Sequence, residues 1–151
     1  MKKTKPFFTA YQKALWLLGR REYGYSELIL ALTRKEYTLE DSKKAVEKLM
    51  ENGYQSDQRA AISLMSNSSL KKEGSALIKA RARTKGLNDE LIKNLIVESD
   101  VDWLIRAERL VLQKFGSGPF DQEKQIKIVR LLMRKGFDLS IAWKIAKQSE
   151  E

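Results

Sequence analysis

The residues of this sequence whose types and spacing suggest chemistry are cationic side chains in helical patterns. The most regular set follows spacings of three, three and four residues: Lys124, Lys127, Arg130 and Arg134. These spacings place all four side chains on one face of a helix. Such a stripe can bind phosphates with release of counterions, or the acidic residues of a protein. It can equally be a solvated helix face, and the pattern alone leaves both interpretations open.

A second group of cations occupies a predicted helix without any intervening acid. Its members alternate in sequence and fan out around the helix: Lys79, Arg81, Arg83 and Lys85. No acidic residue occurs between Glu73 and Asp89. Because like charges four residues apart disfavour an isolated helix, this concentration favours a role with a partner over a structural role.

A third candidate is the pair Arg20 and Arg21, which ends another predicted helix. The pair either recognises a partner or complements the negative end of the helix dipole. Tyr23 and Tyr25 lie in the turn beside it and are candidates for stacking on nucleobases. The three tryptophans have helical spacing beside apolar residues and are expected in the core: Trp16, Trp103 and Trp143.

The composition excludes several kinds of chemistry. The 151 residues include no His and no Cys, which removes imidazole acid–base catalysis, disulfides and thiolate or imidazole metal sites. The acidic group Glu98, Asp100 and Asp102 precedes a predicted helix and is interpreted as capping. The segment Gly116-Ser117-Gly118 lacks the strand and the Lys-Ser/Thr of a phosphate-binding loop. We therefore expect no metal, no cofactor and no enzymatic activity.

The overall charge indicates an anionic partner. There are 29 Lys and Arg against 20 Asp and Glu, a net charge of +9, and 42% of the residues are apolar. This balance is typical of a folded protein that meets a polyanion or an acidic protein surface. No apolar run approaches the roughly 18 residues of a membrane span, and Met1–Lys5 is interpreted as part of a short basic tail. We expect a monomeric protein of the cytoplasm.

The elements that must position these cations are helices arranged as a repeat. Apolar residues recur at spacings of three and four, and no long segment alternates with a period of two. Three punctuating segments lie fifty positions apart: Lys35-Glu36-Tyr37-Thr38, Lys85-Gly86-Leu87-Asn88 and Lys135-Gly136-Phe137-Asp138. Each predicts a helix end with a left-handed residue, then an apolar residue, then an N-cap oxygen for the next helix.

The flanking residues keep the same register. Leu28, Ile78 and Ile128 are equivalent, as are Leu32, Ala82 and Leu132, and Ala45, Leu95 and Ile145. Another helical segment precedes each helix pair, near residues 9–19, 57–69 and 101–115. We predict an all-α fold with three tandem three-helix repeats over residues 9–56, 57–100 and 101–151, after a tail at 1–8. Repeats of this kind give an elongated, curved body.

The local motifs resemble the RecX family, bacterial regulators of the RecA recombinase. The resemblance rests on the order and spacing of short segments: Arg20-Arg21-Glu22-Tyr23 with Ser26-Glu27-Leu28, Asn52-Gly53-Tyr54, Lys85-Gly86-Leu87, Lys114-Phe115-Gly116 and Leu132-Met133-Arg134-Lys135-Gly136-Phe137. It covers about residues 10 to 147. The resemblance implies a protein without catalytic chemistry that binds the RecA filament on single-stranded DNA and inhibits ATP hydrolysis, strand exchange and co-protease activity.

This resemblance would make the protein a modulator of recombination, DNA repair and the SOS response, with the cations above as contacts to RecA or DNA. Single-stranded DNA is the expected nucleic acid, and double-stranded DNA is an alternative. A different function remains open: a stand-alone DNA-binding protein that uses one helix–turn–helix-like unit. A scaffold for another acidic protein is a third interpretation.

Overall fold

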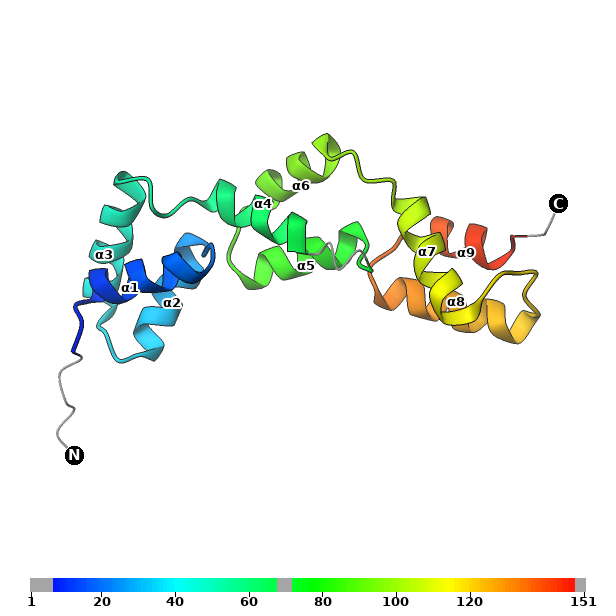
Figure 1. The fold of residues 1–151 in the computed structure, drawn as a ribbon, viewed down its shortest axis with the longest axis horizontal. Helices are drawn as coiled ribbons and strands as arrows, with labels where there is room; N and C mark the ends of the chain where they lie inside the picture. The colour runs from blue at the N-terminus through cyan, green and yellow to red at the C-terminus, as the bar shows by residue number, and fades with distance from the viewer. Residues whose placement is uncertain (1–6, 68–71, 149–151) are drawn as a thin grey trace, which may run out of the picture. The chain divides into compact units, whose positions relative to one another are not determined.

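The computed structural model describes residues 7–67 and 72–148, which form a helical fold (Figure 1). The helices are α1 (Ala10–Arg20), α2 (Tyr25–Arg34), α3 (Leu39–Glu51), α4 (Asp57–Asn67), α5 (Ser75–Thr84), α6 (Asp89–Glu98), α7 (Trp103–Phe115), α8 (Gln122–Arg134) and α9 (Leu139–Ala146). The described residues thus contain nine helices and no strand, which confirms the all-α prediction.

Parts of two sequence predictions lie outside the described residues. These are residues 1–6 of the expected basic tail and residues 68 and 69 at the end of the segment expected to be helical from 57. Within the described ranges, no helix is both long enough and apolar enough to cross a membrane.

Side-chain caps explain where several helices begin. The Thr38 hydroxyl oxygen accepts a hydrogen bond from the Asp41 N–H at 3.0 Å, and the Asn88 side-chain oxygen accepts one from the Glu90 N–H at 2.8 Å. Both caps were predicted from the repeat. Asp138 stands at the N-cap of α9, but its side chain makes no capping hydrogen bond. The prediction for Asp138 is therefore right in position and wrong in its bond.

Helices α1, α2 and α3 pack around one apolar core. Its fully buried members are Ala14, Leu28, Leu32, Val46 and Leu49, with Leu17 nearly so. Four tyrosines pack against the edge of this core: Tyr11, Tyr23, Tyr25 and Tyr37. The Tyr37 hydroxyl donates to the Phe8 carbonyl at 2.6 Å and so holds the entry to α1 against the end of α2.

Helices α7, α8 and α9 pack around a second core. Its central residues are Ala107, Leu110, Ile128, Leu132, Ala142 and Ala146. Trp103 and Trp143 are partly buried and pack against this core, which confirms the prediction that they are core residues.

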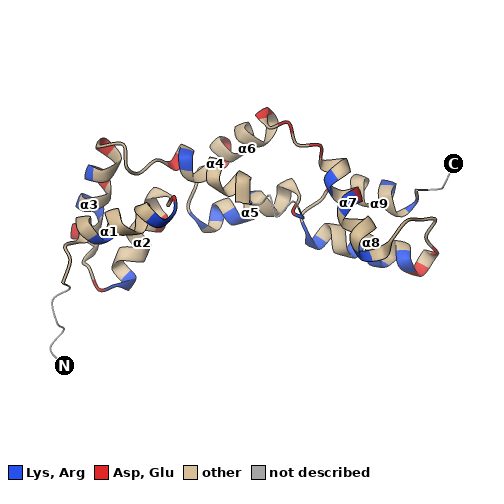
Figure 2. Ribbon diagram, viewed as in Figure 1, with Lys and Arg blue, Asp and Glu red and all other residues tan. Residues whose placement is uncertain are grey.

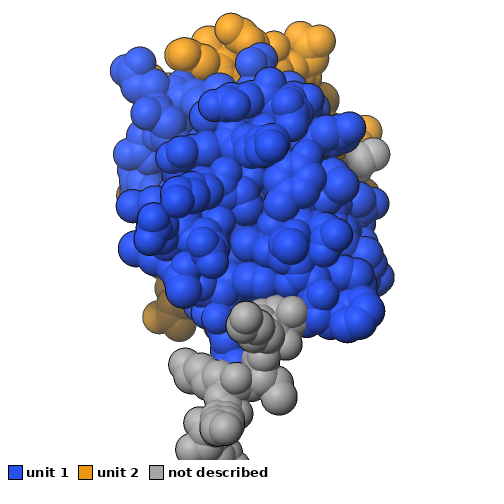
Figure 3. All heavy atoms as spheres, turned by 90° about the vertical axis from the view of Figure 1, so that its left-hand side faces the viewer, with its two compact units in different colours: residues 1–63, 82–91 blue, residues 64–81, 92–151 orange. Residues whose placement is uncertain are grey.

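The fifty-residue register is visible in the burial pattern. Leu28, Ile78 and Ile128 are each fully buried, and the equivalent set Leu32, Ala82 and Leu132 is buried to the same degree. By packing, the chain divides into two compact units, unit 1 with residues 1–63 and 82–91 and unit 2 with residues 64–81 and 92–151 (Figure 3). Helices α4, α5 and α6 contribute residues to both units.

In unit 2, the turn between α8 and α9 packs against the N-terminus of α5. The N–H groups of Gly74 and Ala76 donate to the carbonyls of Lys135 and Gly136 at 2.8 and 3.1 Å. These bonds satisfy backbone donors that a helix start leaves free. A Cβ atom on Gly74 would lie 2.6 Å from the Phe137 nitrogen, so the close approach requires glycine there.

In unit 1, the equivalent turn between α5 and α6 packs against the N-terminus of α2. Here the contact is made by side chains: Lys85 Nζ lies 2.9 Å from Glu27 Oε2. A Cβ atom on Gly86 would come within 2.8 Å of the Ser26 Cβ. In both units, a turn between two helices therefore contacts the start of an earlier helix. The α8–α9 turn does so through backbone hydrogen bonds in unit 2, and the α5–α6 turn does so through an ion pair in unit 1.

The turn between α2 and α3 contains a strained residue, and replacing this residue should stabilise the protein. Glu36 has a φ of 73° where the other two turns have glycine. A left-handed non-glycine residue costs about 1–2 kcal/mol, and glycine removes this cost but loses part of the gain to unfolded-chain entropy. We expect Glu36→Gly to raise the free energy of unfolding by roughly 0.5–1 kcal/mol, measured by urea titration. Glu36→Ala keeps the Cβ and should not stabilise; equal stability of the two variants would contradict the strain.

Candidate cationic binding surfaces

Helix α8 presents its four predicted cations to solvent and its apolar residues to the core. Asp121 begins the helix by accepting a hydrogen bond from the Lys124 N–H at 2.8 Å, and Ile128, Leu131 and Leu132 are buried. The cations are all exposed: Lys124, Lys127, Arg130 and Arg134. Figure 2 shows the basic residues recurring along this helix. At 1.5 Å per residue, this α8 stripe extends over about 15 Å.

The α8 stripe is hardly neutralised from within the protein. Lys127 Nζ lies 3.6 Å from Glu123 Oε1, and both side chains are largely exposed, so this pair contributes little. In the described part of the chain, no carboxylate lies within ion-pair distance of Lys124, Arg130 or Arg134. The charge of the α8 stripe is therefore available to an external anion.

Most cations of the second group form ion pairs with carboxylates of the protein itself, which the sequence analysis did not predict. Arg81 forms an ion pair with Glu73, and this hydrogen bond holds the pKa of Arg81 above its ordinary value. Arg83 Nε lies 3.0 Å from Asp89 Oδ1. Lys85 pairs with Glu27, which is 58 positions away in the sequence. In this group only Lys79, which is partly buried, has no ion pair within the described ranges.

Glu27 is the centre of a small charged cluster in unit 1. Its carboxylate accepts from both terminal nitrogens of Arg21, at 3.3 and 3.2 Å, from Lys85, and from the Gly24 N–H at 3.2 Å. Burial alone raises the pKa of Glu27, but the hydrogen bonds from Arg21 and Lys85 outweigh it and leave the pKa below its ordinary value. The Arg21 guanidinium also lies 3.6 Å from the Tyr23 ring centre. Arg21 and Lys85 are thus held in internal contacts.

Arg20 is placed differently, because it lies over an exposed aromatic ring. Its guanidinium carbon is 4.9 Å from the ring centre of Trp16, and Lys13 Nζ is 4.2 Å from the same centre. The Trp16 side chain is 53% exposed, so the prediction that Trp16 belongs to the core was wrong. The helical spacing beside Leu15 misled it, since Leu15 is itself exposed. A signal was present in the sequence: residues 10–20 contain two cations, Lys13 and Arg20, and no acidic residue.

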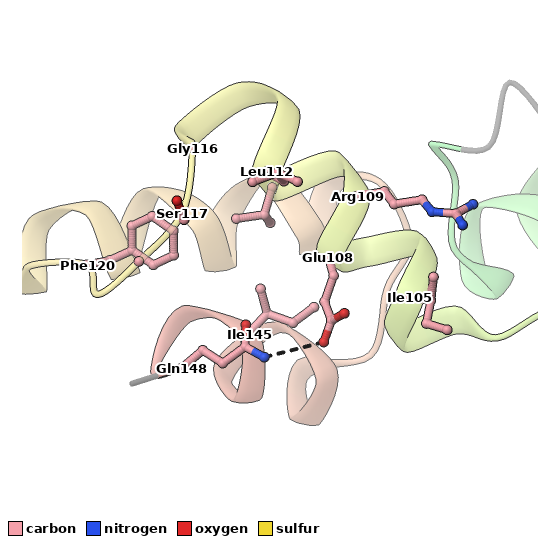
Figure 4. A pocket seen from close by; sticks show the side chains of 11 residues that line it. Ile105, Glu108, Arg109, Leu112, Gly116, Ser117, Phe120, Ile145 and Gln148 are labelled. Carbon is pink, nitrogen blue, oxygen red and sulfur yellow. Dashed lines mark hydrogen bonds between the residues drawn. The ribbon is translucent and has the colours of Figure 1, made fainter. Parts of the chain in front are cut away.

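A shallow pocket of about 480 Å³ lies at the end of α7 in unit 2. Figure 4 shows Glu108 and Gln148 facing one another across its rim, joined by a hydrogen bond of 3.4 Å. Ile105 and Leu112 are exposed beside it. The pocket is lined mainly by apolar side chains and carries a single carboxylate, Glu108.

Of the three acidic residues predicted to act in capping, Asp102 does so. The Asp102 carboxylate accepts the Ile105 N–H at 3.1 Å and caps the helix. Over residues 7–67 and 72–148, no group of three or more acidic residues is arranged to hold a metal ion.

Comparisons with known proteins place the sequence among regulatory proteins named RecX. Residues 10–49 match the model of the first three-helix domain of RecX. The chain is 31% identical to the regulatory protein RecX of Actinobacillus pleuropneumoniae over 86% of this chain and 85% of that protein. It is 37% identical to the regulatory protein RecX of Acinetobacter baylyi over 91% of this chain and 86% of that protein.

Solved structures share the fold. The crystal structure of RecX from Lactobacillus salivarius superposes with a TM-score of 0.72 at 22% identity and covers 90% of this chain and 91% of that chain. A second crystal structure, of a regulatory protein RecX, gives a TM-score of 0.77 at 21% identity and covers 92% of this chain and 72% of that chain. The RecX proteins of Actinobacillus pleuropneumoniae and Acinetobacter baylyi are more than 30% identical to this chain over most of both chains. This protein therefore belongs to the RecX family.

Proposed function

We propose that this protein binds the filament that RecA forms on single-stranded DNA and inhibits its ATP hydrolysis, strand exchange and co-protease activity. Through that binding it modulates recombination, DNA repair and the SOS response in the cytoplasm, acting as a monomer without catalytic chemistry of its own. Membership of the RecX family supports the choice of RecA as partner, because the relatives carry the name regulatory protein RecX and the resemblance to that family implies a regulator of RecA.

The observation that carries the proposal is the unneutralised charge of the α8 stripe. Four exposed cations on one face have a single, loose internal ion pair between them. A nucleoprotein filament offers both phosphates and acidic protein residues to such a surface, and each neutralised phosphate releases counterions. Arg20 and Lys79 are further candidates, since neither has a carboxylate partner in the described part of the chain.

The remaining four candidates are held in ion pairs within the protein. Arg21, Arg81, Arg83 and Lys85 already hold Glu27, Glu73 or Asp89. The carboxylates that hold Arg21, Arg81 and Lys85 are largely buried, so recruiting these cations to a partner would break those pairs, at the cost of the turn between α5 and α6 for Lys85. We therefore assign Arg21, Arg81 and Lys85 to positioning the helices rather than to the partner itself. The Arg83–Asp89 pair is largely exposed and contributes little, so Arg83 stays a candidate for contact with the partner.

The proposal predicts inhibition of RecA ATP hydrolysis on single-stranded DNA at low salt. Increasing amounts of this protein should lower the rate at ratios well below one protein per RecA, because blocking a filament end or groove affects many RecA subunits. Raising the salt concentration should weaken inhibition steeply. The measurement is a coupled ATPase assay at fixed RecA and DNA concentrations.

The control is an unrelated ATPase that also requires single-stranded DNA. If the protein merely covers the DNA, both enzymes are inhibited at similar concentrations, and the stand-alone DNA-binding function gains support. If RecA retains full activity at substoichiometric and equal concentrations in low salt, the proposal fails.

A further inference from the structure

The exposed face of α1 carries an aromatic ring in cationic surroundings. Trp16 lies at the centre, with Lys13 one turn before it and Arg20 one turn after it. Both cations lie over its ring, at 4.2 and 4.9 Å from the centre. We call Lys13, Trp16 and Arg20 the α1 patch.

The space beside the ring is open. A Cβ atom added to Gly19, one turn along the same face, would meet no heavy atom within 4 Å. Leu15 lies four residues before Gly19 on the same side of the helix, extends the apolar surface and is 38% exposed. Since Trp16 is 53% exposed, a flat group can reach the face of the indole by displacing one of the two cations.

The charge around the ring selects the kind of flat group. Helix α1 contains two cations, Lys13 and Arg20, and no carboxylate, so the α1 patch favours a flat group attached to an anion. A nucleobase on its phosphate backbone has this combination, and proteins that bind single strands pair aromatic stacking platforms with cations in the same way. We propose that Trp16 stacks on a nucleobase of single-stranded nucleic acid while Lys13 and Arg20 contact the adjoining phosphates.

Displacing a cation from the ring does not prevent the stack. An exposed cation–π contact changes an equilibrium by about 2- to 5-fold, whereas a base–aromatic stack is worth roughly 5- to 150-fold in affinity. The released cation then lies next to a phosphate, where it gains a new partner. The contacts of Lys13 and Arg20 with the Trp16 ring are therefore too weak to prevent a base from stacking on it.

This inference extends the proposed function, because the single strand within the filament is the ligand, but it is tested without RecA. The readout is Trp16 fluorescence in a variant with Trp103→Phe and Trp143→Phe, titrated with oligothymidylate. We expect quenching on binding. An abasic oligodeoxynucleotide of the same length offers the same phosphates without bases and should quench little.

Affinities measured by anisotropy of labelled oligonucleotides, on the background with all three tryptophans, give a second readout. Trp16→Ala should weaken oligothymidylate binding roughly 5- to 100-fold and change abasic binding less than about twofold. Trp16→Phe should restore most of the loss. The matched control is Tyr54→Ala: Tyr54 is also 53% exposed, has no cation over its ring in the described ranges, and should leave both affinities unchanged.

Several outcomes overturn the inference. These are unchanged Trp16 fluorescence at saturating oligothymidylate, an equal loss on both oligonucleotides, or no oligonucleotide binding at all. Quenching by RecA alone, without DNA, would make the α1 patch a protein contact instead. In each case the ATPase assay with RecA still judges the proposed function separately.

Discussion

Reversing the four cations of the α8 stripe to glutamate is expected to lower the affinity for the RecA filament on single-stranded DNA by roughly 100- to 1,000-fold at about 0.1 M salt. Each phosphate contact contributes roughly 0.7 to the salt exponent of single-strand binding, so the loss of four contacts removes about three units of the slope. The measurement is binding of this variant to RecA–DNA filaments by anisotropy or sedimentation over a range of salt concentrations. The slope must fall together with the affinity.

The variant should keep its fold, because all four side chains are exposed. Glutamate at position 124 stands three residues after the Asp121 cap, where a carboxylate favours the helix start. Glutamate at position 134 lies in the last turn of α8 and costs a few tenths to about 1 kcal/mol through the helix dipole. These effects largely offset one another, so the thermal midpoint should change by only a few degrees.

The matched control changes the same amount of charge elsewhere. Four exposed lysines on other helices are reversed together: Lys43, Lys44, Lys48 and Lys93. Lys44 already pairs with Glu40 at 3.1 Å, and the control should lower filament affinity less than about tenfold through the general field. If both variants bind equally weakly, net charge rather than the α8 stripe drives binding. If the α8 variant binds as well as the parent, the interface lies on another surface.

The fold was largely accessible from the sequence because it repeats. Helical periodicity recovers the elements, and the fifty-residue register identifies Leu28, Ile78 and Ile128, which are all fully buried. Local chemistry also suffices for the caps at Thr38 and Asn88, since cap and helix start lie within three residues. Where local rules failed, at Asp138, the position was right and only the side-chain bond was absent.

The candidate site was less accessible, because ion pairs join residues that are distant in sequence. The acidic residue nearest to Lys85 along the chain is Asp89, yet Lys85 pairs with Glu27, which is 58 positions away. The exposure of Trp16 depends on which side of α1 faces the core, and apolar residues occur on both sides of this helix: Ala14 and Leu17 are buried, and Leu15 is exposed. The periodicity of the sequence does not show which of these faces is buried. The α1 patch could therefore be identified only from the structure.

Gly136→Val is expected to destabilise the protein by about 3 kcal/mol, the largest stability effect of any single change considered. Gly136 has a φ of 89°, which a β-branched residue adopts only with strain. A Cβ there would also lie 2.6 Å from the Leu77 Cβ of α5, and overpacking of this kind adds about 1–3 kcal/mol. At roughly 2–4 °C per kcal/mol for a chain of this size, the thermal midpoint should fall by about 10 °C.

Gly53→Val separates the two causes. Gly53 has a similar φ of 81°, but a Cβ there meets no atom within 4 Å, so this variant carries only the conformational cost of about 1–2 kcal/mol. The difference between the variants measures how tightly the α8–α9 turn packs on α5. Hydrogen exchange gives a local readout, because the N–H groups of Gly74 and Ala76 donate to the carbonyls of Lys135 and Gly136 and should lose protection only in Gly136→Val. If the two variants were equally destabilised and hydrogen exchange of Gly74 and Ala76 were unchanged, the α8–α9 turn would not hold the start of α5 in place in unit 2.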